Sequence, residues 1–69
     1  MNWEEVEGKL FRAETDRFWL QVSPVDGLFY FQVNQKGYEP SAKGYGSTPE
    51  EARQLAERQF ELISSHVDG

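Results

Sequence analysis

The sequence of 69 residues contains no cysteine and a single histidine. Without cysteine the chain has no disulfide, no thiolate metal ligand and no cysteine nucleophile, and this fits a reducing compartment. No apolar run approaches the ~20 residues of a membrane span. The first residues are acidic and polar, where a signal peptide would be basic and then apolar. We therefore expect a cytoplasmic protein that makes no contact with a membrane.

Positive charge is scarce as well. Seven Lys and Arg residues face 12 Asp and Glu residues, so the formal net charge is −5. The acidic residues concentrate at the two ends, since residues 1–8 and 46–69 each carry −3 while residues 9–45 carry +1. A chain with this balance gains little from counterion release on nucleic acid, so the charge disfavours a nucleic-acid partner. The length predicts one small domain, and aromatic residues at 14% supply its core.

Two β-prone runs, Phe18–Val22 and Leu28–Val33, predict a β-hairpin. Between them, residues 24–27 read Pro-Val-Asp-Gly, which favours a four-residue connection built around a type I turn. In that register Val22 faces Phe29, and all the apolar side chains of the hairpin that lie at alternate positions share one face. This set is Phe18, Leu20, Val22, Phe29, Phe31 and Val33.

The segments on either side of the hairpin are expected to form one further strand, a loop or short edge strand, and an N-terminal arm or helical turn. Residues 9–14 read as a first strand that directs Phe11 and Ala13 inward. Residues 38–45 contain a proline and a glycine, so we expect a loop or a short fourth edge strand there. Residues 1–8 are expected to form an irregular N-terminal arm or a short helical turn.

A helix is predicted from Thr48, which precedes Pro49 and stands three residues before Glu51 in a capping-box pattern. Residues 64–69 are expected to be a fraying tail. One apolar stripe at helical spacing is flanked by Phe60 and comprises Ala52, Leu55, Ala56, Gln59, Leu62, Ile63 and Val67. The predicted core combines the inward residues of strands and helix, namely Phe11, Phe18, Leu20, Val22, Phe29, Phe31, Val33, Leu55, Ala56, Leu62 and Ile63.

These elements predict a single α+β domain over residues 1–69 with its core in residues 9–63. It consists of a three-stranded antiparallel β-meander and one C-terminal amphipathic helix packed on one face, in the order β-β-β-α.

Catalytic, metal and cofactor sites are not expected. His66 is the only imidazole and lies in the expected tail, and its neighbours Ser64 and Ser65 do not face it on a helix. The acidic residues at 4–7 lack the glycine and ligand spacing of a calcium loop. The segment Lys43–Ser47 does not match the spacing of phosphate-binding loops. We therefore predict a protein that is not an enzyme.

The sheet face opposite the helix is the predicted binding surface. Strand alternation places Trp19 and Tyr30 there, diagonal to each other in the predicted register and without a helix to cover them. Uncovered aromatic rings form an apolar patch, which a partner protein, a second copy or a nucleobase would cover. In the alternative reading the N-terminal arm folds back, so that Trp3 and Val6 shield this face. The predicted binding residues are Arg12, Trp19, Gln21, Tyr30 and Gln32.

In its element order and in the turn 44–52 that starts the helix, the chain resembles two groups of proteins. One is the arm-type DNA-binding domain of phage integrases, with the similar AP2 domain. The other is a set of small bacterial and prophage proteins of unknown function in which an aromatic hairpin precedes a threonine-capped helix. The resemblance covers about residues 9–63. The integrase-like resemblance implies a base-reading sheet face, which Arg12, Trp19, Gln21, Tyr30 and Gln32 would supply here.

The first functional hypothesis is a protein-interaction module that binds a partner or a second copy of itself through the open sheet face. The alternative is nucleic-acid binding through the same face, as in the integrase domains. A third hypothesis is an acidic phage-type inhibitor that uses Glu50, Glu57 and Glu61 of the helix.

Overall fold

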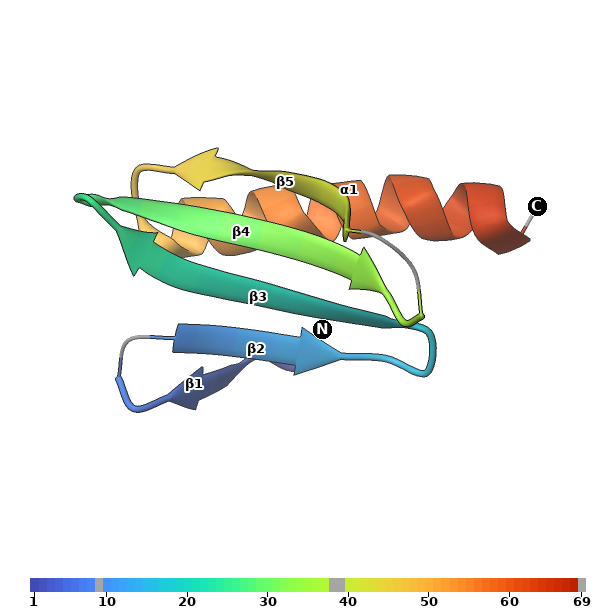
Figure 1. Ribbon diagram of the computed structural model, residues 1–69, viewed down its shortest axis with the longest axis horizontal. Coiled ribbons are helices and arrows are strands. Elements are labelled where there is room, and N and C mark those ends of the chain that lie inside the picture. The colour runs from blue at the N-terminus through green and yellow to red at the C-terminus, as the bar shows by residue number, and fades with distance from the viewer. Residues whose placement is uncertain (9, 38–39, 69) are drawn as a thin grey trace.

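The computed structural model describes residues 1–8, 10–37 and 40–68, and for residues 40–41 and 66–68 the description covers the backbone. The described elements are β1 (Glu4–Val6), β2 (Leu10–Glu14), β3 (Phe18–Val25), β4 (Leu28–Gln35), β5 (Pro40–Gly46) and α1 (Pro49–Asp68). The strands form one antiparallel sheet in chain order, β1-β2-β3-β4-β5 (Figure 1). An α+β fold with an antiparallel sheet and one C-terminal helix is therefore confirmed, with five strands instead of three or four.

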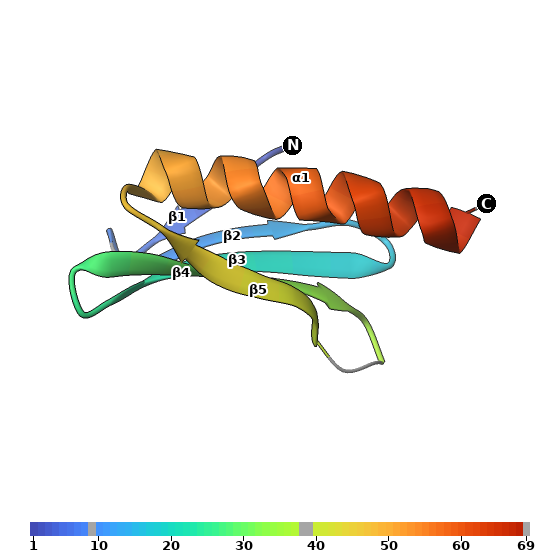
Figure 2. The ribbon, with the colours of Figure 1, turned by 90° about the horizontal axis from the view of Figure 1, so that it is seen from above.

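The molecule has two layers. Helix α1 lies on one face of the sheet, over β3, β4 and β5 (Figure 2). We call this face the inner face. The opposite face, which is toward the viewer in Figure 1, carries no helix and is called the outer face.

The N-terminal segment is a strand, so the expected irregular arm or helical turn is wrong. The connection between Val6 and Leu10 includes Glu7 and Gly8, which both have positive φ, 55° and 70°. Positive φ at such positions lets the chain turn sharply between two antiparallel strands. At the other edge, β5 pairs with β4 and places Pro40 at its first position, where a missing N–H is tolerated.

The hairpin of β3 and β4 is confirmed, but its register differs from the prediction by two residues. The connection is a two-residue turn of Asp26 and Gly27, with φ of 50° and 83°, and Val25 pairs with Leu28. Val22 therefore faces Phe31 instead of Phe29. Because side chains alternate with a period of two, a shift by two residues leaves every side chain on its predicted face.

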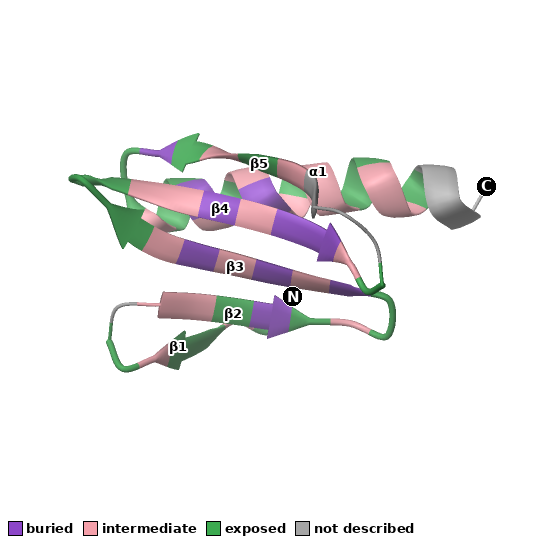
Figure 3. Ribbon diagram, in the orientation of Figure 1, coloured by how far each residue is buried: buried purple, intermediate pink, exposed green. Residues whose placement is uncertain are grey.

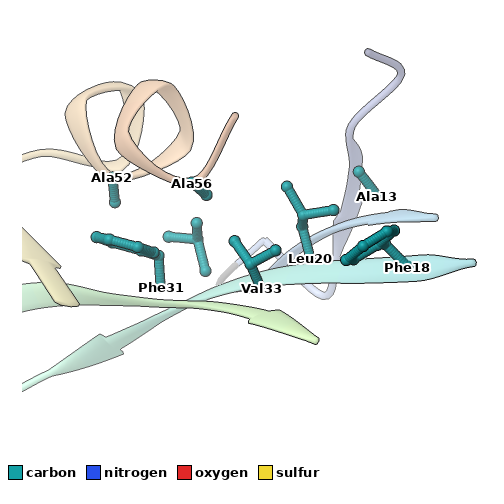
Figure 4. Close-up of a cluster of buried hydrophobic side chains, with 8 residues drawn as sticks. Ala13, Phe18, Leu20, Phe31, Val33, Ala52 and Ala56 are labelled. Carbon is teal, nitrogen blue, oxygen red and sulfur yellow. The ribbon is translucent and has the colours of Figure 1, made fainter. Parts of the chain in front are cut away.

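The core lies between the inner face and α1. Buried residues alternate with half-buried ones over residues 18–23 of β3 and 30–33 of β4, and Asn34 next to Val33 is buried as well (Figure 3). In Figure 4, Ala52 and Ala56 point from the helix toward Leu20, Phe31 and Val33 of the sheet. The buried hydrophobic residues are Ala13, Phe18, Leu20, Val22, Phe31, Val33, Ala52 and Ala56. Phe11, Phe29, Leu55 and Ile63 pack against them, as expected.

The helix starts as predicted, since the Glu51 N–H donates to Thr48 Oγ1 at 3.0 Å. It continues to Asp68, where the sequence led us to expect a fraying tail from residue 64. Leu62, predicted in the core, is 56% exposed. Phe60 takes its place and packs edge-on against Phe18, with ring centroids 5.3 Å apart. With 3.6 residues per turn, the face through Ala52, Ala56 and Phe60 leaves Leu62 on the far side.

Two glycines of β5 permit close approach. A Cβ on Gly44 would lie 2.7 Å from the ring of Phe31, its cross-strand partner. A Cβ on Gly46 would lie 2.7 Å from the backbone nitrogen of Ala52 in the first turn of α1. These contacts hold the edge strand and the start of the helix together.

Some predictions fall outside the described part of the chain. They concern Lys9 as the first residue of a strand, residues 38–39 of the expected loop, and the side chains of His66 and Val67.

Candidate interaction surface

The outer face is organised in rows that run across the strands. One row holds Glu4, Arg12, Gln21, Gln32 and Lys43, one from each strand in sheet order. Arg12, Gln21 and Gln32 are thus direct neighbours, and their strand alternation directs them away from the buried residues between them. The predicted binding residues share one face.

Trp19 and Tyr30 are not diagonal neighbours, because the register differs from the predicted one. Trp19 lies opposite Asn34, whereas Tyr30 lies opposite Ser23, two rows away along the strands. Trp19 is half-buried, and Asn34 beside it is only 4% exposed. Among the residues that the structure describes, the Asn34 Nδ2 has no hydrogen-bond partner. Trp19 is therefore not the exposed centre of the face.

The exposed apolar area lies at the opposite end of the outer face. The rings of Tyr30 and Tyr45, a cross-strand pair, have centroids 5.2 Å apart. Tyr45 is 55% exposed, Val25 38% and Leu28 44%. We call these four residues, Val25, Leu28, Tyr30 and Tyr45, the tyrosine patch. A hollow of about 570 Å³ lies against it, and Lys43 is the charged residue of its lining.

Gln32 connects the patch to the middle of the face. Its Nε2 donates a hydrogen bond to the Tyr30 hydroxyl at 3.2 Å. This contact fixes the phenol end of Tyr30 while the Tyr45 ring supports its face. Tyr30 is thus held in place, and Tyr45 is the more exposed ring of the pair.

The sequence analysis missed Val25, Leu28 and Tyr45 as surface residues. The sequence places Val25 in a longer turn and Leu28 beside it, and it leaves Tyr45 in a loop or a short edge strand. The available signal was alternation: continuing β3 through Val25 places that side chain on the same face as Trp19 and Gln21. For Tyr45, the pairing of β5 with β4 was needed, and this depends on contacts that a local pattern does not contain.

A second hollow occupies the other side of the outer face, at β1 and β2. It measures about 410 Å³ and is lined by Asn2, Glu4, Val6, Arg12, Ala13, Glu14 and Trp19. Its lining combines two carboxylates, one guanidinium and the edge of an indole. We call it the β1 hollow.

The N-terminal segment does not shield the outer face with Trp3, so this alternative is wrong. Trp3 packs against the core, and its Nε1 donates to Glu57 Oε1 of α1 at 2.9 Å. Figure 2 shows the N-terminus beside the helix. Val6 remains on the outer side, opposite Leu10. The tyrosine patch therefore has no cover from residues 1–8.

The acidic helix surface is less continuous than the sequence indicated. The Glu57 carboxylate is engaged by Trp3, whereas Glu50 and Glu61 are exposed. The guanidinium carbon of Arg53, near the start of α1, lies 4.4 Å from the centroid of the Phe11 ring. This cation–π contact covers part of the inner face that α1 does not reach.

One ion pair crosses the sheet beside Trp19. Lys36 Nζ donates to Glu14 Oε2, and both side chains are largely exposed. The hydrogen bond from Lys36 and its positive charge, with a smaller effect of Arg12, lower the pKa of Glu14 below its ordinary 4.5. The pair stabilises the fold at pH values above 4.5, and this contribution is lost as the pH falls through the lowered pKa. Because the pair is exposed, the contribution is small.

Replacing Lys36 by methionine is expected to raise the pKa of Glu14 toward 4.5, because the main cause of its depression is removed. Two-dimensional NMR titration of the carboxyl carbon of Glu14 measures this. Lys43→Met is the matched control, since it removes an exposed lysine from another row of the same face. An unchanged Glu14 pKa in Lys36→Met would contradict the pairing.

Helix α1, the helix of the described chain, lacks an apolar stretch long enough to cross a bilayer. In the described residues, no three or more His, Asp or Glu side chains gather in a group that would hold a metal ion. The comparisons with known proteins found no match: no family model fits the chain, and neither a curated protein nor a solved structure is significantly similar.

Proposed function

We propose that this chain is a non-enzymatic interaction module that binds another protein through its outer sheet face. The observation that supports this most is the tyrosine patch. Four apolar side chains lie together on a face without a covering helix, and Tyr45, Leu28 and Val25 are each more than a third exposed. Contiguous exposed apolar residues of this kind mark interaction sites, and tyrosine is among the residues enriched there.

A matched pair of variants tests the proposal. Tyr45 and Leu62 are 55% and 56% exposed, and they lie on opposite sides of the molecule. Tyr45→Ser is expected to weaken association about tenfold or more, as loss of an aromatic contact residue does, whereas Leu62→Ser leaves association unchanged. Neither position is buried, so both variants should keep the wild-type circular dichroism spectrum.

Association is measured by sedimentation equilibrium for the chain alone, and by calorimetry with each purified protein that the wild type retains. If Leu62→Ser no longer retains the partner protein and Tyr45→Ser still does, the partner binds on the helix side, which would contradict the proposal. Trp19→Ala is a less clean variant, because Trp19 is half-buried and its loss also affects packing.

Nucleic-acid binding through the same face is the alternative, supported by Arg12 and Lys43 in one row with the aromatic residues beside it. Glu4 stands in the same row, and Lys36 is paired with Glu14. Few cations of the described outer face are thus available for phosphates, so under the proposed function binding through this face should depend little on salt. Binding of a short DNA duplex that weakens steeply between 50 and 200 mM salt, a range over which counterion release is diagnostic, would favour this alternative.

A further inference from the structure

We propose that the partner of the outer face is the outer face of a second copy of this chain. In this dimer the two outer faces stack on each other with their strands aligned. The two-fold axis lies between the two sheets and runs parallel to β3. This inference rests on the proposed function and names its partner. It comes from the way charge and apolar surface are distributed across the width of the sheet.

The charges at the two edges are opposite. In the row that crosses all five strands, the edge strand β1 contributes Glu4 and the edge strand β5 contributes Lys43. Rotation by 180° about an axis along β3 lays β1 of one copy over β5 of the other at the same height along the strands. Lys43 of each copy then faces Glu4 of the second copy. Such an interface is isologous, so this contact forms twice.

The centre of the same row suits the axis itself. Gln21 lies on β3 with Gln32 opposite it. An amide is both donor and acceptor, so Gln21 can pair with Gln21 of the second copy across the axis. Of the three charged residues of the row, Glu4 faces Lys43 of the second copy, and Arg12 faces Gln32 of the second copy and lies beside the Glu4–Lys43 contact.

The neighbouring row, toward the β3–β4 turn, is apolar on both sides of the sheet. The same rotation places the apolar residues of one side over those of the other side in the second copy. β1 and β2 contribute Val6 and Leu10, while β4 and β5 contribute Tyr30 and Tyr45. Tyr45 therefore lies over Val6 of the second copy, and Tyr30 lies over Leu10. Val25, at the end of β3, meets Val25 of the second copy near the axis.

The rotation brings the two hollows of the outer face together. The β1 hollow is lined by Glu4 and Val6, and the hollow at the tyrosine patch is lined by Lys43 and Tyr45. Lys43 and Tyr45 are exposed and would lie over the β1 hollow of the second copy.

The other two-fold orientation, with the axis across the strands through the charged row, is unfavourable. It lays β1 on β1 and β5 on β5, so that Glu4 faces Glu4 and Lys43 faces Lys43. It also places Tyr30 over the row of Trp19 and Asn34, where a buried amide and the Glu14 ion pair lie. Like charges placed opposite each other oppose association.

The size of the face predicts a weak dimer. Five strands at 4.7–4.9 Å spacing and about six residues of strand length give about 400 Å² of flat area on each copy. The total of about 800 Å² is below the roughly 1,200–2,000 Å² of stable specific interfaces and corresponds to a weak, transient contact. Self-association should therefore be visible at tens to hundreds of micromolar and absent at low micromolar concentration.

A charge swap tests the arrangement. Lys43→Glu places Glu opposite Glu4 at both contacts, and Glu4→Lys places Lys opposite Lys43 at both contacts. Each variant alone is expected to dimerise about tenfold more weakly than the wild type. In an equimolar mixture both contacts join opposite charges again, so the mixture dimerises like the wild type. Sedimentation equilibrium at low ionic strength measures all three samples.

Matched controls carry the same charge changes on the helix side. Arg58→Glu and Glu61→Lys are exposed positions of α1 and should leave dimerisation unchanged, alone and mixed. Restoration in the Lys43→Glu and Glu4→Lys mixture, without an effect of these controls, supports the proposal.

The outcomes separate this inference from the proposed function. If the wild type is monomeric at several hundred micromolar, the inference that the partner is a second copy is wrong. The outer face would then bind another protein or a nucleic acid. A dimer that Tyr45→Ser weakens, but that the mixture does not restore, overturns the aligned arrangement and keeps the face. A dimer unaffected by Tyr45→Ser overturns both.

Discussion

Replacing Phe31 by alanine is expected to destabilise the fold by about 3–5 kcal/mol, the usual cost of removing a buried phenylalanine ring. Phe31 is only 5% exposed. Its ring covers the backbone at Gly44 and lies below Ala52, so it joins β4 to both β5 and α1 (Figure 4). The whole stability of so small a domain is about 3–5 kcal/mol, so most of the variant should be unfolded at 25 °C. Urea denaturation followed by circular dichroism measures the loss.

Phe29→Ala is the matched control, since Phe29 lies on the same strand and the same face but is half-buried. It should cost clearly less than Phe31→Ala. Phe31→Leu should recover part of the loss, because leucine fills much of the volume. A cost below about 1 kcal/mol for Phe31→Ala would contradict the central position of this ring.

Replacing Gly46 by alanine has the second large expected effect, about 1–3 kcal/mol of destabilisation, in the range of overpacked cores. The added Cβ would lie 2.7 Å from the nitrogen, 3.0 Å from the Cα and 3.2 Å from the Cβ of Ala52. Ala52 is fully buried, and its N–H donates to the carbonyl of Thr48 at 3.0 Å. The helix would have to shift to make room.

Ser47→Ala is the control for this prediction, because Ser47 is the next residue and is exposed. Its unfolding midpoint should match that of the wild type within experimental error. Crosspeak shifts in the first turn of α1 would accompany the Gly46→Ala destabilisation. Equal stability of Gly46→Ala and wild type would show that β5 and α1 do not approach this closely.

The layers of this fold could be predicted from the sequence because they depend on alternation alone. Leu20 and Val33 were assigned correctly to the inner face although their strand register was wrong by two residues. The Asp26-Gly27 pair accounts for the register. It forms a two-residue turn with positive φ at both positions, so β3 continues through Pro24 and Val25. Pro24 is acceptable there because β2 pairs with β3 only as far as Val22.

The edge strand β1 could not be predicted, and β5 could be predicted only as an alternative to a loop, because their residues carry little local signal. β1 has the sequence Glu-Glu-Val, which lacks apolar alternation, and it is held by pairing with β2. β5 contains a proline and two glycines, yet Gly44 is needed where the Phe31 ring crosses the strand. In the sequence Gly44 indicates a loop, whereas in the structure a glycine is needed there because the Phe31 ring of β4 packs against the backbone of β5.

The exposure of the candidate surface also depends on contacts that a local pattern does not contain. The sequence predicts Trp19 and Tyr30 as aromatic residues on an open face, but how far each is exposed depends on its neighbours in the sheet. Asn34 and the Glu14–Lys36 pair surround Trp19, whereas Tyr45 projects from an edge strand. On the helix, the sequence puts Leu62 in the apolar stripe and Phe60 at its flank, and only the position of Ala52 and Ala56 against the sheet decides between them.

The chain-order arrangement of the sheet also bears on how fast the protein folds. Each strand pairs with its neighbour in sequence, the strand connections are short, and the β3–β4 connection is a turn of two residues. Closing such short loops costs little chain entropy, so successive hairpins can add to the sheet without a long-range search. A sheet protein usually folds slowly because its contacts are distant in sequence. Here the sheet grows from local contacts, which leaves the docking of α1 onto the completed β3–β5 surface as the step that joins distant parts of the chain.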